Sequence, residues 1–115
     1  MTPETAVMVV VDIHVGGTAV PAEQFHERAT GLMEELAALE QCNREVIETV
    51  VSSDAARSVL TVEILVDTGD VLKAAQKAFA VLRTALHAAG ATTRKWPRID
   101  RMDNHMEVVG DLSSV

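Results

Sequence analysis

Histidine and carboxylate side chains recur at alternate positions in three short segments, and these groups could bind a divalent metal or transfer protons. If each segment is a β-strand, alternation places them on one surface. The candidates on that surface are Asp12, His14, Glu63, Asp103, His105 and Glu107. Imidazole and carboxylate groups are ligands for zinc, iron or manganese, and they exchange protons near neutral pH. The metal candidates are therefore His14, His105, Asp103 and Glu107, and the catalytic candidates are His14, Asp12 and His105, with Asp12 orienting His14 as a general acid or base.

The same pattern is equally typical of a sheet face that simply meets solvent. In that interpretation His14 lies opposite Asp103, and the two form a cross-strand pair that contributes about 0.2–1 kcal/mol. The two interpretations remain open at this point, because strand register cannot be read from one sequence.

Apolar side chains are predicted on this same surface, which suggests that something covers part of it. They are Met8, Val10, Leu65 and Val109. A second copy of the chain is the simplest cover. The predicted ligand-binding residues are Met8, Val10, Glu63 and Leu65.

Hydrophobic periodicity predicts the elements that must position these residues. Alternation over residues 7–15 indicates a strand with Val7, Val9, Val11, Ile13 and Val15 on its core face. An apolar stripe at helical spacing indicates a helix over residues 21–42. Two strands with a polar turn at 53–56 follow, over residues 45–52 and 58–67, then a second helix from Leu72 to Ala89 that ends at Gly90. A last strand covers residues 102–109, and residues 110–115 are predicted to fray.

The chain repeats itself, because Val11-Asp12-Ile13-His14-Val15 is echoed by Val62-Glu63-Ile64-Leu65-Val66 and a helix pattern follows each. The resulting β-α-β-β-α-β order resembles the ferredoxin-like (split βαβ) superfold. The resemblance implies an α+β fold, with a four-stranded antiparallel sheet and two helices on one face. The first and third strands would then be central, with the last strand beside the first.

Length and composition narrow the function classes. With 115 residues, the chain is expected to be one domain, 1–115. A net charge of −7 disfavours attraction to nucleic acid or to anionic membrane surfaces. The apolar run at residues 6–11 is too short for a membrane span and lacks the basic flank of a signal peptide. Cys42 is the only cysteine, so no intrachain disulfide or thiolate-rich metal site can form. We expect a cytoplasmic protein with no cofactor.

Two other segments have features of binding sites. Gly16-Gly17-Thr18 is similar to a phosphate-binding turn, but it lacks the full glycine fingerprint and a Lys-Ser/Thr pair, which favours a plain connection. Arg94-Lys95-Trp96-Pro97-Arg98, with Arg101, is the one basic cluster. Its Trp could stack a base or a planar ligand, although pairing of the cations with the chain's own carboxylates is favoured.

Within the ferredoxin-like superfold, three branches fit poorly. RNA-recognition motifs need aromatic side chains on the central strands, metal chaperones need a Cys-x-x-Cys loop, and acylphosphatase-like enzymes need an arginine after the first strand. Dimeric α+β barrels and small ligand-sensing or interaction modules fit better.

We therefore expect a homodimer that associates through its open sheet face and acts as a binding or interaction module. The alternative is a barrel-type enzyme or metal site that uses His14. An accessory subunit that needs a different protein is the third interpretation.

Overall fold

The computed structural model describes residues 5–16, 21–91 and 96–109. The elements follow the predicted order: β1 (Ala6–Gly16), α1 (Ala22–Cys42), β2 (Val46–Asp54), β3 (Val59–Val66), α2 (Val71–Ala88) and β4 (Arg98–Val109). The predicted frayed tail and the Gly17-Thr18 turn lie outside the described residues.

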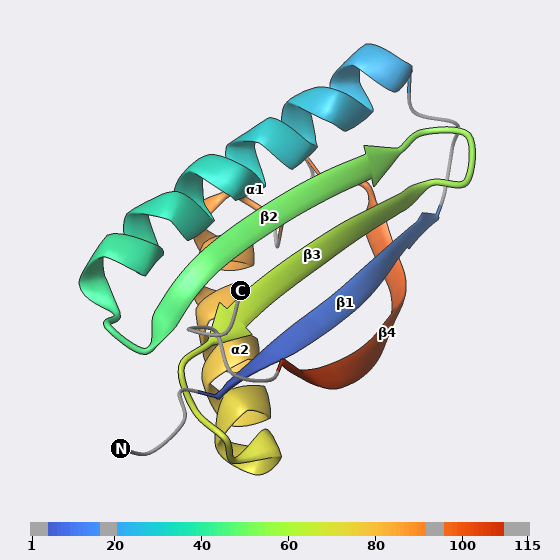
Figure 1. Ribbon diagram of the computed structural model, residues 1–115. Coiled ribbons are helices and arrows are strands. Elements are labelled where there is room, and N and C mark those ends of the chain that lie inside the picture. Colours follow the sequence, from blue (N-terminus) through green and yellow to red (C-terminus); the bar gives the residue numbers. More distant parts are fainter. Residues whose placement is uncertain (1–4, 17–20, 92–95, 110–115) are drawn as a thin grey trace.

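The strands form one antiparallel sheet in the order β2-β3-β1-β4, with β1 and β3 at the centre as predicted. Both helices pack on one face of it, and β4 runs along the outer edge beside β1 (Figure 1). The opposite face, which no helix covers, is called the open face below.

Alternation in the two central strands determines which side chains enter the core. Every second residue of β1, from Val7 to Val15, is buried, and Leu60, Val62, Ile64 and Val66 are buried in β3. The α1 stripe meets them through Phe25, Ala29, Leu32 and Leu36. Since these side chains are almost all aliphatic, the core is held by close packing of branched groups rather than by ring stacking.

Helix α2 begins with a side-chain cap. Asp70 Oδ1 accepts hydrogen bonds from the backbone N–H groups of Leu72 and Lys73, at 3.0 and 3.3 Å. This satisfies two of the N–H groups that have no partner inside a helix.

Helix α2 packs on the sheet with a side that combines small and branched residues. Ala74, Ala78 and Ala85 are fully or almost fully buried, and Leu82 and Leu86 also lie in the core, whereas Leu72 in the first turn is 67% exposed. Small side chains allow the helix backbone to approach the sheet closely, so the alanine side turns inward and Leu72 turns out.

The β2–β3 turn lies later than predicted. Ser53 and Asp54 belong to β2, and the chain reverses over residues 55–58. Asp54 Oδ1 accepts from the Arg57 N–H at 3.2 Å, and Ser58 has a positive φ of 55°. The polar pair therefore ends the strand and caps the turn instead of forming it.

Strand β4 starts four residues before the predicted start at Met102. Its pairing with β1 shifts between His14 and Val15, where Arg101 and Ile99 are the successive partners and Asp100 is the additional residue of a β-bulge. A Cβ on Gly16 would lie 1.8 Å from Asp100 Oδ2. Gly16 therefore leaves the space in which the bulge places this carboxylate.

Candidate functional site

The sheet register places the candidate residues on the open face. Residues that pair directly across antiparallel strands point to the same side. Four cross-strand rows result: Glu48, Leu65, Met8 and Glu107; Val50, Glu63, Val10 and His105; Ser52, Thr61, Asp12 and Asp103; Asp54, Val59, His14 and Arg101. The sequence-based assignment of Asp103, His105 and Glu107 to the same face as Asp12, His14 and Glu63 therefore agrees with the register.

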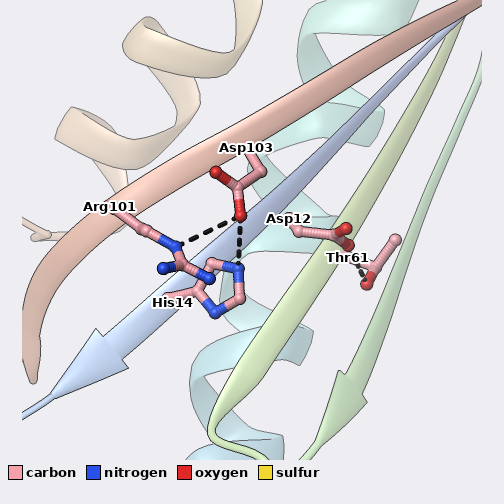
Figure 2. Close-up of polar contacts among 5 residues, drawn as sticks. All are labelled: Asp12, His14, Thr61, Arg101 and Asp103. Atoms are coloured by element: carbon pink, nitrogen blue, oxygen red, sulfur yellow. Dashed lines mark hydrogen bonds and ion pairs between the residues drawn. The ribbon is translucent and has the colours of Figure 1, made fainter.

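His14, Asp103 and Arg101 form a polar cluster between β1 and β4, called the His14 cluster below. His14 Nε2 lies 3.0 Å from Asp103 Oδ2, and Arg101 Nε donates to the same oxygen at 3.2 Å (Figure 2). The predicted His14–Asp103 pair is present, although the two residues are diagonal neighbours, because His14 pairs directly with Arg101. The His14 side chain is 24% exposed and the Asp103 side chain 57%, so the cluster sits at the surface with its imidazole partly enclosed.

Asp12 contacts a different group from the one expected. Its Oδ1 accepts a hydrogen bond from Thr61 Oγ1 at 2.7 Å, on the side of β3 (Figure 2). The carboxylate that contacts His14 is Asp103, so Asp103 holds the position that the sequence-based hypothesis gave to Asp12. Neither Thr61 nor Arg101 was among the predicted site residues, because only the register shows that they adjoin the two aspartates.

His105 and Glu107 lie further along β4 from this cluster. His105 pairs with Val10, whereas His14 lies four residues away along β1, which corresponds to about 13 Å along the strand. Within residues 5–16, 21–91 and 96–109, no three His, Cys, Asp or Glu side chains are placed to hold one metal ion. Of the four metal candidates, His14 and Asp103 are in contact, whereas His105 and Glu107 lie further along the strand.

The apolar side chains of the open face lie in its first two rows, where charged residues flank them. Met8 and Val10 of β1 are half-buried, and Leu65 of β3 retains 9% of its exposure. Val50 of β2, 38% exposed, extends this surface and was missed in the sequence analysis. We call Met8, Val10, Val50 and Leu65 the apolar patch; the predicted ligand residue Glu63 lies between Val10 and Val50 in its row.

Trp96 does not take the role of a stacking platform. Its side chain is 6% exposed within the hydrophobic core, and its Nε1–H donates to the Ala89 carbonyl at 3.0 Å. Among the described cations of the basic segment, Arg98 pairs with Asp100 at 2.8 Å and Arg101 with Asp103. Pairing with the chain's own carboxylates, the favoured interpretation, is therefore observed for both arginines; Arg94 and Lys95 lie outside the described residues.

A cleft of about 470 Å³ lies on the helix side of the sheet, between α2 and the adjacent ends of β2 and β3. Lys77 Nζ lies in it, 3.0 Å from Glu45 Oε2 and 2.6 Å from Asn43 Oδ1. Its charge is thus balanced inside the chain, and the cleft is separate from the open face. No helix in the described part of the chain is long and apolar enough to cross a bilayer.

No protein-family model and no curated protein matches the chain, but solved structures do. A dimeric ferredoxin-like protein of unknown function from Thermobifida fusca YX is 17% identical, with a TM-score of 0.58, over 91% of this chain and 92% of the other. A dimeric ferredoxin-like protein from an uncultured marine organism is 14% identical, with a TM-score of 0.56, over 92% and 89%. The fold is ferredoxin-like.

The similarity extends to a protein with a suggested activity. A proposed antibiotic biosynthesis monooxygenase from Caulobacter crescentus CB15 is 16% identical, with a TM-score of 0.51, over 93% of this chain and 90% of that one. At such identities the ferredoxin-like architecture is what the proteins share, and it hosts many unrelated functions.

Proposed function

We propose that this chain is a homodimeric binding module whose two subunits associate through their open faces. The observation that carries the proposal is the apolar patch on a sheet face that neither helix covers. Apolar side chains gathered on one face of a sheet gain free energy when a second surface removes them from water. The description of ferredoxin-like neighbours as dimeric supports association of two copies.

The His14 cluster gives this interface a polar end. The apolar patch and the cluster occupy opposite ends of β1, since Met8 lies in the first row and His14 in the fourth. Two such faces packed together would enclose a space with apolar walls and an imidazole–carboxylate pair at its margin. Sites of this kind bind small organic molecules, because apolar walls supply affinity and a few polar groups fix orientation. The single free Cys42 is compatible with the cytoplasm, where we place the protein.

The dimer is tested by substituting one residue at the centre of the patch. In sedimentation or light-scattering measurements, Val10→Asp should convert the face-to-face dimer to a smaller species, because it buries a carboxylate against an apolar surface. Leu72→Asp is the matched control, since Leu72 is an exposed apolar residue on α2, away from the open face. An unchanged mass for Val10→Asp, with the fold intact by circular dichroism, would refute the face-to-face interface.

Enzyme activity is the second candidate function, and the His14–Asp103 contact favours it. A carboxylate that holds one imidazole nitrogen leaves the other free to accept or donate a proton. The description of a structural neighbour as a proposed monooxygenase is weak support, because only the fold is shared. Native mass spectrometry of protein purified without chelator tests both functions: a stoichiometric organic adduct supports the site between the subunits, and a retained metal supports the enzyme.

A further inference from the structure

Strand β4 presents a long outer edge. It is twelve residues long, pairs with β1 on one side, and is the last strand of the sheet on the other (Figure 1). Nearly all its side chains are exposed, including those on the helix side. The backbone N–H and C=O groups of such an edge form a template for pairing with another strand.

The charges along this edge are self-complementary. Arg101, Asp103, His105 and Glu107 all point to the open face. In antiparallel pairing with a second copy centred on Asn104, Arg101 faces Glu107 of that copy and Asp103 faces His105. The two-fold axis repeats both pairs, so every charged side chain on this face meets a partner of opposite or neutral charge.

The charged side chains of β4 are exposed enough to contact a second strand. The Arg101 side chain is 67% exposed, and it contacts Asp103 through Nε. The remaining guanidinium N–H groups can therefore reach a carboxylate on a second strand. Glu107 and His105 are both exposed.

On the helix side of the same register, a methionine lies on each side of the central Asn104. Met102 and Met106, 38% and 37% exposed, point toward the helices. Met102 of each copy would face Met106 of the other copy. Met102 also lines a cleft of about 360 Å³ with Phe79, Leu82 and Leu86 of α2. A second copy would bring its own Met106 to the mouth of this cleft and cover apolar surface that α2 leaves open.

Neighbouring registers lack this complementarity. Centring the pair on Asp103 sets two aspartates against each other and places Arg101 opposite His105. Centring it on His105 places Asp103 opposite Glu107. Like charges directly opposite each other destabilise a strand pair. The β-bulge at Asp100 lies just outside the segment 101–107. The residues with complementary charges therefore belong to the part of β4 that pairs regularly with β1.

We propose that the outer edge of β4 is a second interaction surface, and that its partner is β4 of another copy of this chain, antiparallel and centred on Asn104. The backbone edge of β4 is distinct from the open face, but Arg101, Asp103, His105 and Glu107, which select the register, point to that face. The two interfaces are therefore tested separately, the open face by Val10→Asp and the edge by cross-linking. If both surfaces are used, the assembly is larger than a dimer.

Disulfide trapping tests the register directly. In a Cys42→Ser background, which removes the exposed native thiol, Asn104→Cys places two thiols opposite each other across the two-fold axis. Directly paired residues of antiparallel strands lie within disulfide range, so mild oxidation should yield a covalent dimer. Val108→Cys is the matched control on the same face of β4: its two copies would be about 26 Å apart, so it should remain monomeric on a denaturing gel.

Charge exchange gives an independent readout. Glu107→Arg sets two arginines against each other in each pair, so the trapped fraction of the Asn104→Cys protein should fall several-fold. Adding Arg101→Glu should restore it. Cross-linking of Val108→Cys in preference to Asn104→Cys would overturn the proposal, as would a trapped fraction that ignores both charge changes. If Asn104→Cys gives no covalent dimer but Val10→Asp still converts the wild-type dimer to a smaller species, the edge surface is refuted and the open-face dimer stands. If Asn104→Cys still gives a covalent dimer in a Val10→Asp background, the edge surface forms without the open-face dimer.

Discussion

His14 and Arg101 both contact the same carboxylate oxygen of Asp103. The pair is partly exposed, and exposed ion pairs contribute little to stability. Its value to the protein would then lie in binding or proton transfer.

We therefore expect the double variant His14→Ala/His105→Ala to keep its fold and its mass. The free energy of unfolding should fall by less than about 1 kcal/mol in urea titrations. His87→Ala, at an exposed position of α2, is the control. In a binding module, only ligand retention by native mass spectrometry changes. If the protein is an enzyme, activity or metal content should disappear at unchanged stability, and a large loss of stability would contradict both functions.

Gly16 and Asp100 form a second residue-scale test. A methyl group on residue 16 would overlap the Asp100 carboxylate. Because this carboxylate is the movable end of a half-exposed side chain, the overlap should cost less than the roughly 1–3 kcal/mol of overpacking in a rigid core. Gly16→Ala should therefore lower the unfolding free energy, and most of that loss should vanish in an Asp100→Ala background. A double-mutant cycle in urea measures this coupling. Equal losses in both backgrounds would mean that the carboxylate does not occupy the space beside Gly16.

At the scale of elements, α2 offers a clear test because its first turn depends on one side chain. Asp70→Ala removes the acceptor for two backbone N–H groups and should lower the unfolding free energy by about 0.5–2 kcal/mol. Asp67→Ala, a nearby exposed carboxylate before the helix, should change it little. Equal effects of the two substitutions would assign the loss to charge instead of to capping.

The elements also show which structural features could be predicted from the sequence. Strict alternation in β1 and β3 predicted the central strands and their buried faces. When one face of a sheet is covered, a two-residue period leaves one way to place the apolar side chains against the core. Helical spacing predicted α2, but it does not show that Leu72, in the first turn, is 67% exposed while Ala74 and Ala78 are buried. The early start of β4 was hidden because its first residues, Arg98–Arg101, are mostly charged and contain the bulge.

The candidate site was predictable in part for the same reason. Alternation assigned Asp12, His14, Asp103 and His105 to one face, but it did not give their order across the sheet. The structure shows that order: His14 pairs directly with Arg101, next to the bulge, and contacts Asp103 diagonally. For the basic segment, the favoured interpretation agrees with the structure at Arg98 and Arg101, and the Trp96 ring is buried in the core.

Considered over the whole molecule, the open face carries an excess of negative charge. Its four rows contain six carboxylates (Asp12, Glu48, Asp54, Glu63, Asp103 and Glu107) and one guanidinium, Arg101. Two such faces repel each other in association, whereas the proposed β4 edge pairs opposite charges. The two surfaces should therefore respond to salt in opposite ways.

Raising the NaCl concentration from about 0.05 to about 0.5 M shortens the range of these interactions. We expect sedimentation of the wild-type protein to show a tighter face-to-face dimer, because screening weakens repulsion. Disulfide trapping of Asn104→Cys should fall over the same range, because screening weakens the Arg101–Glu107 and Asp103–His105 pairs. Trapping that increases with salt would indicate that the methionines, and not the charges, hold the edge together.

The burial of Trp96 has a spectroscopic consequence. The chain contains one tryptophan and no tyrosine, so its near-ultraviolet emission comes from a single indole that is anchored to the Ala89 carbonyl just after α2. That ring is 6% exposed and belongs to the hydrophobic core. Its emission maximum should stay constant while subunits associate or separate, and should shift to longer wavelength only when the junction between α2 and β4 opens. Every assembly variant described above therefore carries an internal indicator that separates lost association from lost folding.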